Sequence, residues 1–183
     1  VSAPVCPDAT DLIDAIDEFR GTVSFMPNFA FNHCVNGIRD EDLAGLDLSC
    51  CRLMVNGGEP VLFESLQNFA AKFSPCGFRS SALGAAYGAT ENSSSVTITP
   101  LGRPPAVDWV DRQRLQQFQQ AVPAQPQSRG SVAIVSCGCP LPGIELKIAD
   151  ESGRESPERW VGEIITRAAT TAGDYFRRPD LAQ

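Results

Sequence analysis

The chain has 183 residues, 43% of them hydrophobic, so it can bury the core of one domain or one large subdomain. Its formal net charge of −7 leaves no basic face for the phosphates of nucleic acid, so we expect no nucleic-acid partner. No apolar run approaches the roughly 20 residues that cross a bilayer, and no signal peptide is recognisable, so we expect no membrane span and a cytoplasmic location.

The seven cysteines are an odd number, and their spacing matches neither a disulfide framework nor paired zinc-binding knuckles. The closest pair is Cys137-Gly138-Cys139, but no second pair accompanies it and the single histidine, His33, is distant in sequence. We therefore expect reduced and mostly buried thiols, without a catalytic role for the cysteines or for His33.

The first segment predicts a helix and then a strand. Residues 8–20 place apolar side chains at helical spacing behind a polar N-cap. Thr22–Met26 is short, β-branched and aromatic, which favours a buried strand that Pro27-Asn28 ends. An aromatic-rich segment, Phe29–Val35, follows, and after it a helical turn or two and an acidic loop.

A second strand, turn and helix come next. Cys51–Val55 is an apolar run, Asn56–Pro60 is a turn, and Val61–Phe73 has apolar side chains at helical spacing. Two successive strand-turn-helix units indicate parallel strands joined by right-handed crossovers. In such a sheet, ligands gather at the carboxyl ends of the strands.

The rest of the chain differs in kind. Ser95–Thr99 predicts a strand, and residues 101–130, rich in Pro, Gln and Arg, predict a surface insertion with a short helix near Asp111–Gln120. Three strand-like runs between Pro and Gly turns then predict an antiparallel part: Ser131–Ser136, Glu145–Ala149 and Gly162–Arg167.

The predicted fold class is therefore α/β: a sheet with parallel strands flanked by helices, plus a smaller β-rich portion near the C-terminus. We expect residues 1–100 to form the α/β subdomain, residues 101–130 the surface insertion and residues 131–183 the β-rich portion.

Two turns carry candidate chemistry. In Asn56-Gly57-Gly58-Glu59-Pro60, the glycines let the backbone approach a flat ligand closely, although Asn-Gly-Gly also forms ordinary turns. Tyr87-Gly88-Ala89-Thr90-Glu91 offers a ring that can stack on a base, a hydroxyl for a phosphate and a carboxylate for Mg²⁺. The alternative for this second turn is a solvent-exposed loop with a core tyrosine.

These motifs occur in an order and spacing that resembles the adenylate-forming superfamily, and within it fatty acyl-AMP ligases match best. The segments that carry the resemblance are Met26–Asn32, Asn56–Val61, Tyr87–Glu91, Val135–Pro140, Gly162–Ile165, Ala172–Phe176 and Arg178-Pro179. The similarity covers nearly the whole chain from Thr22 onward.

The resemblance implies an enzyme that joins a fatty acid to AMP at the expense of ATP and passes the acyl group to the phosphopantetheine thiol of an acyl carrier protein. It implies that Asn56, Gly57, Gly58, Glu59 and Pro60 line the adenine. Tyr87 would then stack on or flank the base, with Gly88 beside it.

The resemblance also assigns the reacting end of the site. Thr90 would touch the α-phosphate and Glu91 would hold Mg²⁺, so these two are the candidate catalytic residues. Phe29 and Phe31 would border the acyl tunnel, although both could equally be ordinary core aromatics.

Two features bear on the substrate. Fatty acyl-AMP ligases often have Ala at the position of Thr90. The resemblance therefore indicates the reaction more directly than it indicates the substrate class. In that family an added segment after the Tyr-Gly motif accompanies loss of CoA use, and Leu101–Arg129 stands in the corresponding place. The alternatives are an acyl-CoA synthetase of the same superfamily and a non-catalytic module that binds nucleotide or lipid.

The family's phosphate loop, ribose-binding strand and lysine-bearing C-terminal domain have no counterpart in this sequence. We therefore expect an inactive internal fragment of a larger N-terminal domain.

A fragment cut from its domain should expose apolar surface, so we predict that the isolated chain self-associates. Light scattering over a range of protein concentrations measures this directly. A monomer at every concentration would contradict the prediction.

Overall fold

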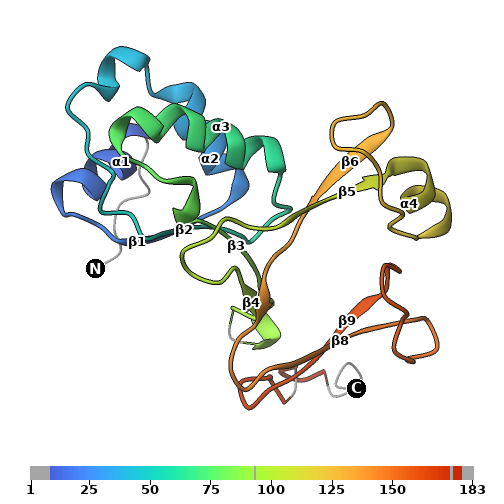
Figure 1. Cartoon of the computed structure of the whole chain (residues 1–183). Coiled ribbons are helices and arrows are strands. Elements are labelled where there is room, and N and C mark those ends of the chain that lie inside the picture. Colours follow the sequence, from blue (N-terminus) through green and yellow to red (C-terminus); the bar gives the residue numbers. More distant parts are fainter. Residues whose placement is uncertain (1–8, 93, 174, 179–183) are drawn as a thin grey trace.

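The computed structural model describes residues 9–92, 94–173 and 175–178 (Figure 1). Asp8, Asp174 and Pro179, which belong to the predicted first helix and the last two motifs, lie outside the described residues. The principal sheet has the strand order β1-β2-β3-β4-β7. The first three strands are parallel, and the last two pairings are antiparallel.

The predicted first helix, the two predicted strands and the helix after the second strand all form. Helix α1 (Ala9–Glu18) precedes β1 (Val23–Met26), and β2 (Leu53–Asn56) precedes α3 (Phe63–Phe73). Helix α2 (Asn28–Gly37) occupies the aromatic-rich segment between them. Helices α1, α2 and α3 lie together on one face of the parallel strands (Figure 1). The predicted α/β class is confirmed, with helices on one face of the described sheet.

Strand β3 (Leu83–Tyr87) was not predicted from the sequence. It pairs with β2 in parallel, with Met54 opposite Leu83 and Asn56 opposite Ala85. Its sequence, Leu-Gly-Ala-Ala-Tyr, has no β-branched residue, and its first four residues are buried. Small side chains suit a strand that its neighbours cover closely. The pairing with β2 compensates for the low strand propensity of these residues.

The remaining elements are short. β4 (Thr97–Ile98) pairs with β3, and β7 (Cys139–Pro140) pairs with β4. Four 3-10 turns complete the connections of the first half: Asp40–Leu43, Ser74–Cys76, Ser80–Ala82 and Thr90–Asn92.

The predicted insertion contains a strand. β5 (Val107–Asp111) pairs with β6 (Ser131–Val135) over five residue pairs, and α4 (Arg112–Phe118) follows β5. Val110 of β5 is fully buried, and the ring of Trp109 packs edge-on against Phe63 of α3 at 5.5 Å. Residues 101–130 therefore share a two-stranded sheet with residues 131–183. The division of the chain at residue 130 stays a prediction.

The last two strands form an antiparallel hairpin. β8 (Glu145–Ala149) pairs with β9 (Glu163–Arg167) along their whole length. The antiparallel character predicted for this end of the chain is confirmed. Within the described residues the longest α-helix has 11 residues, and none of the helices could span a bilayer.

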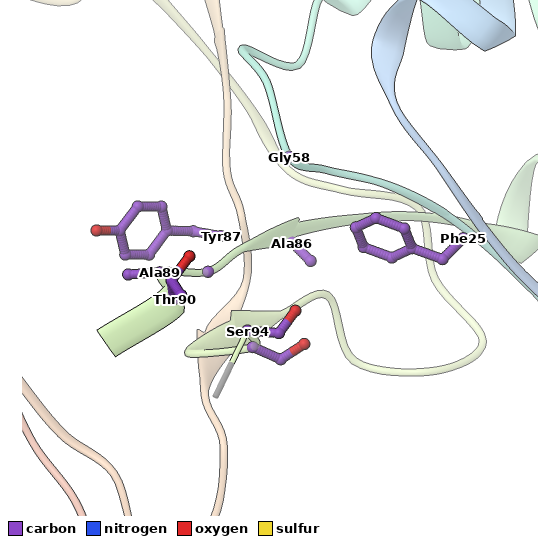
Figure 2. A pocket seen from close by; sticks show the side chains of 9 residues that line it. Phe25, Gly58, Ala86, Tyr87, Ala89, Thr90 and Ser94 are labelled. Atoms are coloured by element: carbon purple, nitrogen blue, oxygen red, sulfur yellow. The ribbon is translucent and has the colours of Figure 1, made fainter. Parts of the chain in front are cut away.

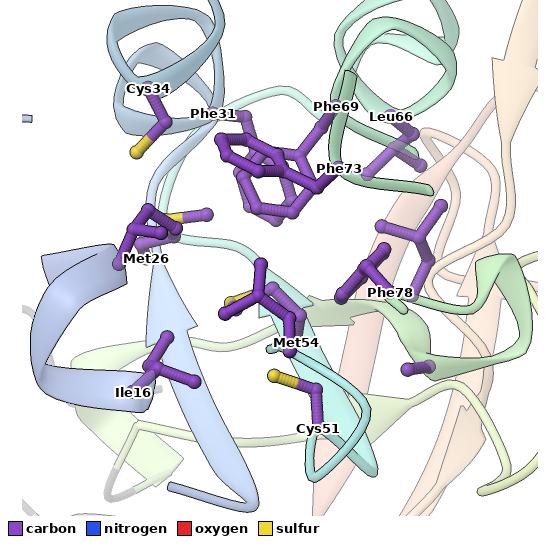
Figure 3. Close-up of a cluster of buried hydrophobic side chains, with 14 of the residues drawn as sticks. Ile16, Met26, Phe31, Cys34, Cys51, Met54, Leu66, Phe69, Phe73 and Phe78 are labelled. Atoms are coloured by element: carbon purple, nitrogen blue, oxygen red, sulfur yellow. The ribbon is translucent and has the colours of Figure 1, made fainter. Parts of the chain in front are cut away.

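The core lies between the helices and the parallel strands (Figure 3). Phe31 of α2 and Phe69 and Phe73 of α3 are fully buried, and Met54 of β2 is buried with them. The Phe69 ring lies 4.9 Å from Phe31, 4.6 Å from Phe73 and 5.2 Å from Phe78, centroid to centroid. Aromatic pairs at these distances add to the stability gained by burial.

Six cysteines lie among the described residues, and all are free thiols. Burial raises the pKa of Cys34 to about 11 and that of Cys51 to about 12. These two thiols are therefore protonated at neutral pH and behave as small apolar core residues.

We predict that Phe69→Ala lowers the free energy of unfolding by about 3–5 kcal/mol, because it removes the central ring of this cluster and leaves a cavity. Urea denaturation measures the change. The control is Phe19→Ala, since Phe19 is 75% exposed and its loss should cost less than about 0.5 kcal/mol. Equal effects of the two substitutions would contradict the assignment of Phe69 to the core centre.

Candidate active site

The two predicted motifs meet at the carboxyl ends of neighbouring parallel strands. Asn56 ends β2 and Tyr87 ends β3, and the two strands are hydrogen-bonded to each other. An open cavity of about 500 Å³ lies there (Figure 2). Its lining residues are Phe25, Gly58, Ala86, Tyr87, Gly88, Ala89, Thr90, Ser94 and Ser95.

Four of the predicted site residues line this cavity: Gly58, Tyr87, Gly88 and Thr90. The other predicted site residues are not part of the lining: Asn56, Gly57, Glu59, Pro60, Glu91, Phe29 and Phe31. Gly57 is buried against β3, where a Cβ atom would come within 3.0 Å of the Ala86 carbonyl oxygen and of the Phe25 ring. Gly58 has a φ of +83° and open space around it, so glycine is needed there for backbone conformation.

Asn56 is fully buried and turns its side chain away from the cavity. Its Nδ2 donates to Asn28 Oδ1 at 3.0 Å, and the Leu62 N–H donates to the same oxygen at 3.0 Å. Asn28 Nδ2 in turn donates to Ser65 Oγ at 3.1 Å. This buried network fixes the turn after β2 to the start of α2 and of α3.

Glu59 connects the same turn to helix α2. Its Oε1 accepts a hydrogen bond from the backbone N–H of Phe29, in the first turn of that helix. The N-cap of α2 is Pro27, whose side chain makes no capping hydrogen bond. The carboxylate therefore stabilises the N-terminal end of the helix dipole in place of a local cap. Glu59 and Pro60 are exposed, and their adenine-lining role stays a prediction.

The loop after β3 requires glycine at position 88. A Cβ atom there would lie 1.5 Å from the Ser94 carbonyl oxygen, because the chain folds back on itself and Val96 N–H donates to the Tyr87 carbonyl. Thr90 is exposed beside the cavity, at the start of the turn Thr90–Asn92. The fold thus presents the Tyr87 ring and the Thr90 hydroxyl to the same space.

Glu91 is exposed, next to the cavity lining, and interacts with a distant segment. The Tyr175 hydroxyl donates to Glu91 Oε1 at 2.7 Å, and the Ala172 N–H donates to its backbone carbonyl at 2.6 Å. The Tyr175 hydrogen bond holds the pKa of the Glu91 carboxyl below its ordinary value, so this side chain is ionised at neutral pH. An ionised, exposed carboxylate suits a Mg²⁺ ion that shares its oxygen ligands with phosphates and water.

Asn92, the residue after Glu91, holds the loop after β3 in place. Asn92 is 5% exposed; its Nδ2 donates to Thr166 Oγ1 at 2.6 Å, and its Oδ1 accepts from Thr171 Oγ1 at 2.8 Å. The loop after β3 is therefore tied to β9 and to the turn that follows it.

The two aromatics predicted for the acyl tunnel lie apart. Phe31 is fully buried in the helix-sheet core, and Phe29 on the same helix is 65% exposed. Neither lines the cavity. Phe31 therefore has the core role that the sequence left open, and contact of either residue with an acyl group stays a prediction.

Sequence reasoning assigned no site role to Tyr175 or to five residues of the lining: Phe25, Ala86, Ala89, Ser94 and Ser95. Phe25 could have been found, since it stands near the carboxyl end of a predicted strand, where ligands bind in such sheets. Tyr175 stands in a segment that carries the family resemblance, but its contact with Glu91 has no local signal, because it spans 84 positions of sequence.

The AMP-binding enzyme family matches residues 2–176. The chain belongs to the AMP-binding enzyme family. It is 35% identical, over 91% of its length, to a medium-chain fatty acid–[acyl-carrier-protein] ligase of Moorena producens. It is 36% identical, over 80% of its length, to a long-chain fatty acid–AMP ligase of Mycobacterium marinum.

A solved structure of this family has the same fold. The fatty acid AMP ligase of Legionella pneumophila superimposes with a TM-score of 0.88 over 94% of the present chain, at 32% identity. A fatty acyl-adenylate ligase of that organism, in complex with acyl adenylate and pyrophosphate, superimposes equally well. The chain spans 28% of the Moorena ligase, 24% of the Mycobacterium ligase and 30% of the Legionella chain.

We predict that Tyr175→Phe raises the pKa of the Glu91 carboxyl, because it removes the hydrogen bond that lowers this pKa most. This hydrogen bond stabilises the folded state fully above the pKa that the carboxyl has in the unfolded chain. The stabilisation is lost as the pH falls through the lower pKa that the carboxyl has in the folded state. An NMR titration of the Glu91 side-chain carbon measures the shift. Tyr87→Phe, which makes the same change at the other tyrosine, should leave the pKa of Glu91 unchanged. An unchanged pKa of Glu91 in Tyr175→Phe would contradict the contact between Tyr175 and Glu91.

Proposed function

We propose that this chain is part of an AMP-forming ligase that joins a fatty acid to AMP at the expense of ATP. The observation that carries the proposal is the cavity at the strand ends, where Gly58, Tyr87, Gly88 and Thr90 meet around about 500 Å³. The names of the Moorena and Mycobacterium relatives agree with this reaction class. We expect the isolated chain to be inactive, since it spans so little of those ligases.

In the proposed reaction a carboxylate oxygen of the fatty acid attacks the α-phosphorus of ATP. The bond from that phosphorus to the bridging oxygen breaks, and acyl-AMP and pyrophosphate form. Tyr87 stacks on the adenine, and the Thr90 hydroxyl donates to an α-phosphate oxygen. These contacts hold the reactants in line and stabilise the charge that develops, so the step needs no protein nucleophile.

Glu91 is the residue that would hold Mg²⁺ in this enzyme. The ion, when bound, neutralises charge on the phosphates and the leaving pyrophosphate. Across the part of the chain that the structure describes, no group of three or more His, Cys, Asp and Glu side chains could hold a metal. A single carboxylate can hold Mg²⁺ when phosphate oxygens and water complete its coordination.

The acceptor in the second step is the phosphopantetheine thiol of an acyl carrier protein. The thiol attacks the acyl carbonyl carbon, a thioester forms and AMP leaves. The carrier protein in the name of the Moorena relative supports this acceptor. We also propose a cytoplasmic location, because the cytoplasm supplies the ATP that this reaction consumes.

We predict that Glu91→Ala lowers kcat for acyl-adenylate formation by about 10²–10³-fold in the full-length protein that carries this segment, because one electrostatic contact to the transition state is lost. Pyrophosphate release with ATP, Mg²⁺ and fatty acids, with and without CoA, measures the reaction. Glu158→Ala, at an exposed carboxylate on the turn before β9, is the matched control.

Three outcomes separate the candidate functions. Acyl-AMP without acyl-CoA supports the carrier-protein ligase, and acyl-CoA as product assigns the protein to the acyl-CoA synthetases. No turnover of any carboxylate by the wild-type protein would refute the enzyme and favour a nucleotide- or lipid-binding module.

A further inference from the structure

Two neighbouring cysteines, Cys50 and Cys51, stand just before β2, and the proposed reaction uses neither of them. They precede the amino end of this strand, away from the cavity at its carboxyl end. Cys51 is 3% exposed and belongs to the core cluster (Figure 3), whereas Cys50 is half-buried. The pair therefore joins a thiol that a reagent can reach to a thiol in the core.

Both thiols point to one backbone oxygen. The Cys50 thiol donates to the Gly21 carbonyl oxygen, with its Sγ at 3.4 Å, and the Cys51 thiol donates to the same oxygen, with its Sγ at 3.9 Å. Cys50 Sγ also lies 3.8 Å from the carbonyl oxygen of Ile16, in helix α1. Neighbouring side chains of an extended strand point to opposite faces. The turn before β2 instead brings both sulfur atoms to the same place.

The two thiols also contact each other. Burial is the main cause of the raised pKa of Cys51, and the Cys50 thiol raises that pKa further by its charge and by a hydrogen bond between the two side chains. The positive charges of Arg20 and Arg79 oppose the rise in the pKa of Cys51. These two cations therefore favour loss of a thiol proton when the sulfur atoms bind a ligand.

A second pair of cysteines is equally close in sequence but is not joined in this way. The Cys137 carbonyl accepts a hydrogen bond from the Thr97 hydroxyl at 2.8 Å, and Cys139 lies on the short strand β7. Burial is the cause of the raised pKa of Cys137, and a second thiol has no part in it. The fold thus brings together Cys50 and Cys51, whereas spacing in the sequence alone would favour either pair.

We propose that Cys50 and Cys51 form a dithiol site for trivalent arsenic compounds, which bind through two sulfur atoms. Thiol sulfur is a soft ligand, and a soft centre prefers it to oxygen. With phenylarsine oxide, two As–S bonds replace the As=O bond, and the two thiol protons leave with the oxygen as water. Arsenic stays trivalent, so the step needs no oxidant. Cys50 forms the first bond because it is the more accessible thiol, and Cys51 closes the ring.

The test uses the full-length protein that carries this segment, in its folded state, with phenylarsine oxide as the probe. Gel filtration removes loosely held reagent, and mass spectrometry of the intact protein counts the phenylarsine groups that remain. Cys50→Ser and Cys51→Ser should each retain about one group fewer than the wild type, since a single sulfur cannot chelate the arsenic. Cys137→Ser, which removes one thiol of the second pair, is the control and should retain as many groups as the wild type.

Equal retention by the wild type and Cys50→Ser overturns the inference. Loss of a group in Cys137→Ser also overturns it, because spacing in the sequence would then select the thiols. A measurement on the wild-type protein needs no variant: bound phenylarsine should protect Cys50 and Cys51 from iodoacetamide added after unfolding, and alkylation of both would refute the site. All these outcomes are independent of adenylation activity, so the proposed function stands or fails separately.

Discussion

Parallel pairing of β1, β2 and β3 is the constraint on which the rest of the structure depends. It aligns Met26 with Asn56 and Asn56 with Ala85, so the three strands end at one edge of the sheet. Each carboxyl end is followed by a different segment, and the cavity lies at this edge of the sheet. Antiparallel pairing at β2 would have sent the two turn motifs to opposite edges.

The helix layer is joined to this edge by polar contacts as well as by the aromatic core. Asn28 contacts Asn56, Ser65 and the Leu62 backbone, while Glu59 accepts from Phe29. Buried amides stabilise a structure only when they are hydrogen-bonded, so this network selects one position of the turn. Among the described residues, Asn56 Oδ1 is the buried side-chain atom without a hydrogen-bond partner. These contacts therefore fix the turn after β2 to the start of α2.

Several elements could be predicted and others could not, for reasons that lie in the residues. α1 and α3 have apolar side chains at helical spacing, and β1 and β2 are apolar runs closed by turn residues, so local pattern is sufficient. β3 is built of Leu, Gly, Ala and Tyr, and α2 begins after a proline without a local cap. Both are stabilised by neighbours: β2 pairs with β3, and Glu59 caps α2 from 30 positions away.

The sequence by itself determined the order of the strand-turn-helix units, the two glycine-bearing turns and the family to which their spacing belongs. Only the tertiary structure decided that Phe31 lies in the core while Phe25 faces the cavity, and that Tyr175 reaches Glu91. The reason is physical. Glycine and turn residues act through their own backbone, whereas the surroundings of a strand side chain depend on which face the helices cover, and a contact across 84 positions depends on the whole path of the chain.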